Sequence, residues 1–434
     1  MSNTCAANTE TNPRTPKVPW VTFLFLAVMF FVASHDFFYS VKRMQSSNPS
    51  EDELLTGVAE GNLSHRIAYV GLGVFGALSL IRKSRTRFRI NGALAWLVLF
   101  FVVWAFSSLA WAHDPALTLR RLVVFGMLCL GALAVSKRLS SRDMVSWVLF
   151  SAASYLAVGF LAETVLGSLR LFAPEYRFAG TLHPNQQGLN CALLVLSGVA
   201  ASQTARRGRT FFRAFGLIGF VFLVLTGSRT AFAAATLALL FYWGLVWSRL
   251  RALAVTYCTL TILVALLFFG ADAFLPVLRR AVVLGRESSS VETLTGRVPV
   301  WQECLDYAVK RPLHGYGYGG FWTPTHISEV SATQAWGVAE GHSAYLDLLL
   351  SVGLTGMVTF ILMLALGISQ SVAHYRTSQN NAYAFVAALL LFCALHGLLE
   401  SAIVHPSMLM FLCMLTLVHL AFQNSPTSKQ VVGL

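Results

Sequence analysis

The segment Glu340–Leu364 reads EGHSAYLDLLLSVGLTGMVTFILML and joins a polar tetrad directly to a long apolar run. The run is long enough to cross a bilayer as a helix, which needs about 20 mostly apolar residues. His342 therefore lies close to the point where a predicted helix enters the membrane. Histidine is costly in lipid and ordinary in loops, so its role depends on the topology around it.

The whole chain has the composition of a membrane protein. Of its 434 residues, 56% are hydrophobic and only 12% are charged, whereas about 25% are charged in a typical soluble protein. We therefore expect an all-α polytopic membrane protein with about twelve transmembrane helices. The predicted helices are 18–40, 67–81, 91–111, 117–135, 144–163, 188–203, 214–227, 230–247, 252–275, 344–368, 382–400 and 407–423.

The basic residues are arranged in blocks between alternate predicted helices. In a soluble protein the net charge of +13 would suggest a nucleic-acid partner. Here all four blocks, Arg82–Arg89, Lys137–Arg142, Arg206–Arg213 and Arg249–Arg251, fall on one side, which the positive-inside rule assigns to the cytoplasm. We therefore expect cytoplasmic tails at 1–17 and 424–434, helices one to nine within 18–275, a large outer loop at 276–343, and helices ten to twelve within 344–423.

The outer loop 276–343 is long, and long loops are usually functional. Apolar residues at helical spacing predict a helix that begins near Pro299 and ends before Pro312. The run GYGYGG, Gly315–Gly320, matches a dinucleotide-binding motif in letters but lacks the flanking strand and helix that the motif needs. We interpret it as a tight loop whose tyrosines, Tyr316 and Tyr318, are candidates for stacking on sugar rings.

Four arginines are predicted at the outer edge of the membrane, where the positive-inside rule does not explain them. Arg229 lies in the short turn TGSRTA, Arg297 in TGR, and Arg120 and Arg121 near the outer end of the fourth helix. Arginine binds phosphate oxygens bidentately and keeps its charge. These residues predict a site for a lipid diphosphate, the alternative for each being an interfacial arginine that snorkels to water.

His342 is a candidate general base. The N-terminus of the following helix and the nearby arginines both disfavour a proton on its ring. A neutral imidazole at pH 7 is the form that a base needs. The alternative is an ordinary loop histidine with satisfied hydrogen bonds.

Acidic residues provide rival sites. Glu51, Asp52 and Glu53 in the first outer loop suit a base or a metal ligand, or else form a solvated charge run. His35 and Asp36 form a second polar pair without an assigned role. His326 and Glu329 share a loop, but two ligands make a weak metal site. We therefore expect no metal.

Five short motifs, in this order, resemble the bacterial O-antigen ligase and O-antigen polymerase superfamily over about residues 175–360. They are RFAGTLHPNQQG at 177–188, LTGSRTA at 225–231, TGRVPVW at 295–301, HGYGYGGF at 314–321 and GHSAYLDLLLSVGLTG at 341–356. The resemblance implies a GT-C-like glycosyltransferase fold in the bacterial inner membrane, with the active site on the periplasmic side.

The resemblance also implies a reaction. The donor would be a polysaccharide on undecaprenyl diphosphate, and the acceptor a sugar hydroxyl of lipid A–core in lipopolysaccharide biosynthesis. The family's essential histidine matches His342, and its two periplasmic arginines match Arg229 and Arg297. Ligases often have asparagine after the histidine, where this chain has Ser343. Transfer would invert the anomeric configuration without cofactor, nucleotide or metal.

Further candidate substrate contacts are Arg177, Asn185 and Tyr345, which lie on the same predicted side. Two alternatives stay open. An O-antigen polymerase shares the donor and differs in the acceptor. A polysaccharide or lipid transporter is a different class, but transporters place their sites near the midplane, whereas the polar residues here gather at the outer edge.

Overall fold

The computed structural model describes residues 19–34, 55, 62–81, 90, 92–171, 173, 176–205, 207–247, 293–334 and 336–422. Over these residues the regular secondary structure is helical throughout. Each apolar segment predicted from the sequence overlaps a helix, except 252–275, which lies outside the described residues, as do residues 35–40 of the first predicted segment. The predicted all-α class is confirmed for the described part of the chain.

The helices before the outer loop are α1 Trp20–Ser34, α4 Leu63–Ile81, α5 Gly92–Ser107 with the 3-10 turn η1 Ser108–Trp111, α6 Pro115–Ser136, α7 Ser141–Val165, α8 Pro184–Thr204, α9 Arg209–Leu225 and α10 Arg229–Val246. The later helices are α14 Thr293–Lys310, α15 Pro324–Thr333, α16 Ala344–Ser378, α17 Asn381–His396 and α18 Met408–Phe422. Among the described residues, six helices are long and apolar enough to cross a membrane. The chain is a multi-pass membrane protein.

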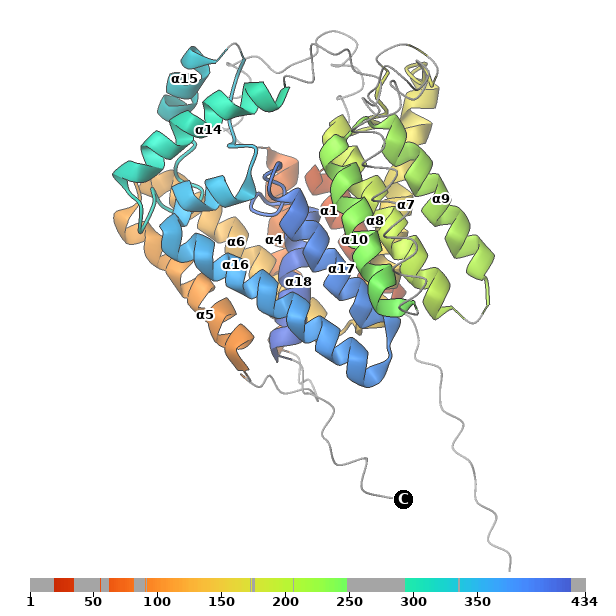
Figure 1. Ribbon diagram of the computed structural model, residues 1–434. Coiled ribbons are helices and arrows are strands. Elements are labelled where there is room, and N and C mark those ends of the chain that lie inside the picture. The colour runs from red at the N-terminus through yellow and green to blue at the C-terminus, as the bar shows by residue number, and fades with distance from the viewer. Residues whose placement is uncertain are drawn as a thin grey trace, which may run out of the picture.

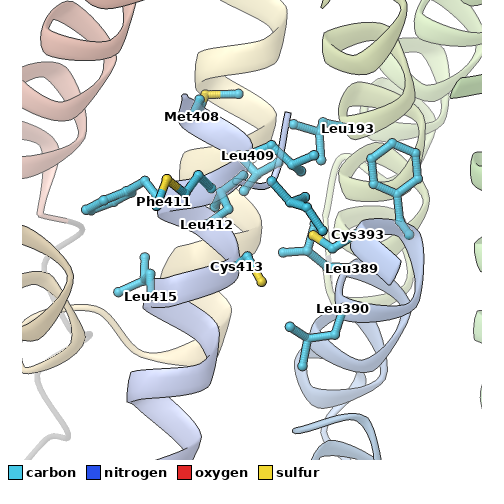
Figure 2. Packing of buried hydrophobic residues seen from close by; sticks show 14 of the residues in the cluster. Leu193, Leu389, Leu390, Cys393, Met408, Leu409, Phe411, Leu412, Cys413 and Leu415 are labelled. Atoms are coloured by element: carbon cyan, nitrogen blue, oxygen red, sulfur yellow. The ribbon is translucent and has the colours of Figure 1, made fainter. Parts of the chain in front are cut away.

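The helices form two packed groups joined by α16, α17 and α18. On one side, α8, α9 and α10 pack together and against α17, and on the other α5 and α6 pack against α16 and α18 (Figure 1). Figure 2 shows the seam, where Leu409 and Leu412 of α18 meet Leu389 and Cys393 of α17 and Leu193 of α8. These side chains are almost completely buried, so the seam holds the two groups in fixed relation.

The helix that follows His342 is broken at Gly353, which has φ +70°. Only glycine adopts this conformation without strain, and a side chain here would collide with the backbone of Leu313. The break frees two backbone groups of α16. The Leu350 carbonyl accepts a hydrogen bond from the Tyr316 N–H at 2.8 Å, and the Leu354 N–H donates to the Pro312 carbonyl at 2.8 Å. The loop after α14 is thereby inserted into the broken helix.

The outer loop differs from the prediction at the start of its helix. α14 begins at Thr293, so Pro299 lies inside the helix rather than at its opening. An interior proline loses one backbone hydrogen bond and crowds the carbonyl four residues before it, but α14 continues through Pro299. The end is as predicted, since α14 stops at Lys310, before Pro312. A second helix, α15, was not anticipated.

The candidate site and a predicted basic block lie at opposite ends of the bundle. His342 lies two residues before the start of α16, whereas Arg142 donates to the Asn380 side chain, 3.5 Å away, at the connection between α16 and α17. The length of α16 separates them. This arrangement matches the relative placement expected from the charge pattern.

Candidate active site

A cavity of about 520 Å³ opens between the N-terminal end of α10 and the C-terminal end of α17. Arg229, the first residue of α10, and Arg297 of α14 both line it, together with Asn185 and Glu400. Its remaining wall is mainly aliphatic and consists of Ala233, Ala234, Leu237, Leu395, Leu398 and Leu399, with Gly227, Ser228 and Thr230 at the turn. The cavity therefore combines two arginines and one carboxylate with an aliphatic wall, and a lipid with an anionic head has both polar and apolar parts to match.

Arg297 is held in a fixed orientation by the chain segment after α17. Its Nη1 donates to the Leu399 carbonyl, and its Nη2 lies 2.9 Å from Glu400 Oε1. The same carboxylate oxygen accepts a hydrogen bond from Asn185 Nδ2 at 3.1 Å. Asn185 Oδ1 in turn accepts from Arg177 Nη2 at 2.7 Å. A series of hydrogen bonds thus connects Arg177 through Asn185 and Glu400 to Arg297. Of the two predicted contacts, only Asn185 also lines the cavity.

His342 lies on a tight turn next to this cavity. Its φ of +48° is in the left-handed region, which costs free energy for a residue with a side chain. The preceding peptide is fixed on both sides: the Gly341 N–H donates to Asp347 Oδ1 at 3.0 Å, and the Gly341 carbonyl accepts from Trp301 Nε1 at 2.9 Å. Strain that persists under such constraint is typical of functional sites.

Asp347 connects three segments of the chain. It is 3% exposed and, besides Gly341, accepts hydrogen bonds from Trp322 Nε1 at 2.8 Å and from Ser401 Oγ. His405 Nε2 lies 3.6 Å from its other oxygen. The loop after α14, the turn at His342 and the segment after α17 are therefore held by one carboxylate.

The electrostatic surroundings keep His342 neutral. Burial lowers the pKa of His342 to about 4, and the positive charge of Arg297 adds to this effect. Burial is thus the main cause and an arginine contributes, as the sequence suggested, whereas the expected effect of the helix N-terminus stays a prediction. The Nδ1 atom lies 3.3 Å from Glu340 Oε1. The contact does not have the geometry of a hydrogen bond, so it does not decide which ring nitrogen carries the proton.

Three residues near the cavity have the composition of a metal-ligand set. Glu340, His342 and Glu400 each place one ligand atom within 4.8 Å of the others. The sequence did not suggest this group, because two helices, α16 and α17, separate Glu400 from His342 along the chain. The turn between these helices brings Glu400 back to the end of the bundle where His342 lies. Glu400 is already paired with Arg297, so a cation would compete with that arginine for the same oxygens.

The other predicted arginines lie elsewhere. Arg121 lines a separate small cavity of about 30 Å³, together with Tyr318, Asp347 and His405, on the far side of Asp347. Arg120 is exposed. The structure therefore brings Arg229 and Arg297 into one cavity and places Arg121 in another.

The predicted tyrosine contacts serve mainly as packing residues. Tyr316 is buried and donates from its hydroxyl to the Tyr307 carbonyl at 2.9 Å. Tyr318 is buried against Phe125, with ring centroids 4.7 Å apart. Tyr345 lines an apolar groove beside Ser343 and donates to the Ala394 carbonyl at 2.8 Å.

The rival residues are accounted for in part. Glu51, Asp52, Glu53, His35 and Asp36 lie outside the described residues. His326 Nδ1 lies 2.7 Å from the Phe321 carbonyl, and Glu329 accepts a hydrogen bond from the Tyr307 hydroxyl at 2.6 Å. These two side chains therefore have protein partners of their own.

Comparison with known proteins shows which proteins this chain is similar to. Residues 214–361, which include Arg229, Arg297 and His342, match the family model described as O-Antigen ligase. The chain is also similar to the exopolysaccharide production protein ExoQ of Rhizobium meliloti (strain 1021), with 25% identity over 314 residues that cover 69% of each chain. The comparisons confirm the resemblance to the O-antigen ligase-like superfamily that the sequence motifs predicted, and they support a function of the ligase or polymerase type.

Proposed function

We propose that this protein is an O-antigen ligase, which transfers a polysaccharide from undecaprenyl diphosphate to a sugar hydroxyl of lipid A–core. The observation that carries the proposal is the cavity that combines Arg229 and Arg297 with an aliphatic wall. A polyprenyl diphosphate has the same two parts. Its diphosphate suits the two guanidinium groups, and its chain suits the residues of α10 and α17.

The proposed chemistry follows from the position of His342. Its ring lies beside Glu400, which lines the cavity, so an acceptor hydroxyl at His342 would face the sugar at the end of the diphosphate. A nitrogen of the neutral ring removes the hydroxyl proton as the oxygen attacks the anomeric carbon. The bond to the diphosphate breaks, and its growing negative charge is stabilised by Arg229 and Arg297. Direct displacement inverts the anomeric configuration.

The wider setting is part of the proposal. We infer about twelve membrane helices, a GT-C-like fold, both termini in the cytoplasm, and an active site on the periplasmic face of the inner membrane, in a loop spanning 276–343. The separation of Arg142 from His342 supports this orientation. The activated lipid donor supplies the leaving group, so the reaction needs neither nucleotide nor metal.

The name of one relative favours a second candidate. Exopolysaccharide production, as that protein is described, suits a polymerase that uses the same donor with a second lipid-linked sugar as acceptor. Deletion of the gene separates the two functions. A lost ligase leaves lipid-linked polymer accumulating and lipid A–core bare, whereas a lost polymerase leaves single repeats on the core. A deletion strain with neither change would contradict both assignments.

A further inference from the structure

The helix α14 has three distinct faces. Val300, Cys304 and Ala308 recur every fourth residue and are buried against the rest of the outer loop and α16. On another face, the side chains of Val298, Leu305 and Val309 are 42%, 48% and 76% exposed. At 100° per residue these three fall within a stripe about 40° wide, whose centre lies about 120° from the centre of the buried face.

The remaining face of α14 is charged. Asp306 and Lys310, one turn apart, are both exposed and lie between the apolar stripe and the buried face. A helix in water would have polar residues over both exposed faces. A helix with one face in protein, one apolar and one charged is typical of a membrane interface, where the apolar face enters the boundary between headgroups and acyl chains.

The apolar stripe is continuous with the surface of a membrane-spanning helix. Trp301 and Leu305 of α14 line an open groove of about 270 Å³ together with Leu349 and Met357 of α16. Met357 lies beyond the break at Gly353, in the main part of that span. Further along the same helix, Leu354, Val358, Ile361 and Leu362 are exposed, as expected for side chains that face lipid.

The orientation of α14 agrees with such a position. In Figure 1 the helix lies across the outer ends of α5, α6 and α16 rather than alongside them. The exposed Lys310 ends the helix, and a cation there suits the phosphates of lipid headgroups, whereas the partly buried Arg311 that follows donates to the Trp111 carbonyl at 3.3 Å.

We propose that α14 is an interfacial helix whose partner is the phospholipid surface, with Val298, Leu305 and Val309 inserted among the acyl chains. This inference does not depend on the proposed reaction. It has a consequence for the site, however, because α14 carries Arg297 and because Trp301 fixes the peptide before His342. Contact with the membrane would hold both residues at the level of a lipid headgroup.

Site-directed spin labelling of the full chain in phospholipid nanodiscs tests the proposal. Val309→Cys and Asp306→Cys are each labelled with a nitroxide, and collisions with oxygen and with a water-soluble nickel chelate are compared. The two positions lie on the same helix less than one turn apart, so Asp306→Cys is the matched control. Ile361→Cys on α16 gives the reference for a lipid-facing position, and labelled protein without the substitutions gives the background from native cysteines.

We expect the Val309→Cys label to favour oxygen, as at Ile361→Cys, and to lie about 5–10 Å below the phosphates. The Asp306→Cys label should favour the nickel chelate. Val298→Cys, at the other end of the stripe, should behave like Val309→Cys and replaces it if that variant does not fold. Equal exposure to the nickel chelate at the stripe positions and at Asp306→Cys would overturn the proposal.

Discussion

The backbone N–H of Gly341 donates to Asp347 Oδ1 at 3.0 Å, so the residue before His342 is fixed by a carboxylate on the first turns of α16. Trp301 Nε1 holds the carbonyl of the same residue from the opposite side. The strained conformation of His342 thus depends on two side chains that come from different elements.

Removal of either support should slow transfer without weakening donor binding. Asp347→Ala leaves buried donors unpaired, a loss of about 1–3 kcal/mol, and we expect kcat to fall roughly tenfold or more. Asp347→Asn keeps an acceptor for Gly341 and should recover most of that loss. The donor KM should be unchanged in both variants, because Asp347 does not line the arginine cavity. Steady-state kinetics with purified, folded variants measures both constants.

Trp301→Phe tests whether the two supports act together on Gly341, whose N–H binds Asp347 and whose carbonyl binds Trp301. Alone, it should lower kcat several-fold, consistent with the loss of about one hydrogen bond. Combined with Asp347→Ala, its effect should be smaller than the product of the two, since the residues share Gly341. Trp111→Phe, which removes a similar indole bond to the His314 carbonyl at 3.0 Å, is the matched control. Fully multiplicative effects of Trp301→Phe and Asp347→Ala would argue against a common target.

Lysine should replace neither Arg229 nor Arg297. Arg297 uses two guanidinium nitrogens to bind the Leu399 carbonyl and Glu400, a geometry that an ammonium group lacks. We expect alanine variants to lose on the order of 2–4 kcal/mol of transition-state stabilisation, or roughly 30- to 900-fold in kcat/KM. Lysine variants should recover little of this. Wild-type rates in both lysine variants would show that charge alone is sufficient.

The pH dependence should report the low pKa of His342. Because the neutral ring is the active form, activity is present above its pKa of about 4 and is lost as the pH falls through that value. A histidine with an ordinary pKa near 6.5 would lose about tenfold at pH 5.5, whereas this enzyme should keep nearly all its activity there.

The titration of Glu340 must be separated from that of His342 in this measurement. Partial burial raises the pKa of Glu340 to about 7. Its carboxylate lies 3.3 Å from Nδ1 of His342, so a change in its charge between pH 5.5 and 7 would also affect the measured activity. The profile is therefore recorded in Glu340→Gln, with donor binding measured at each pH. If the activity of Glu340→Gln falls to half at a pH near 6.5, the conclusion that burial lowers the pKa of His342 is wrong.

Transfer should continue in excess EDTA. Arg229 and Arg297 already provide positive charge at the cavity, and a cation at Glu340, His342 and Glu400 would compete with Arg297 for Glu400. Glu51→Gln combined with Asp52→Asn should also change little. If chelation stops transfer and added Mg²⁺ or Mn²⁺ restores it, a metal carries the charge stabilisation and His342 acts as a ligand.

Local sequence signals predicted much of this structure. Apolar run lengths located the helices, and the outer position of arginines identified Arg229 and Arg297, which share one cavity. The GYGYGG segment was predicted as a tight loop, and Gly315, Gly317 and Gly319 all have positive φ. These features depend on residues that are close together in the sequence, so they can be predicted without knowledge of the fold.

Residues that act through long-range contacts were missed. Glu400 and His405 approach the site only because the turn between α16 and α17 returns the chain to the outer end. Asp347 carried a usable signal, a carboxylate within an apolar membrane run, which is a functional hypothesis by default. Sequence position also did not show that Arg121 lines a different cavity from Arg229 and Arg297, so its proposed contact with the donor stays a prediction.

The most direct test of the central claim uses purified protein, lipid-linked polysaccharide and lipid A–core, with His342→Ala as the comparison. Electrophoresis should show a ladder of polysaccharide joined to lipid A–core with the wild-type protein. His342→Ala, folded and still binding the donor, should give no ladder. A normal ladder from His342→Ala would contradict the role of His342 as the base, and no joined product of any kind from the wild-type protein would contradict glycan transfer at this site.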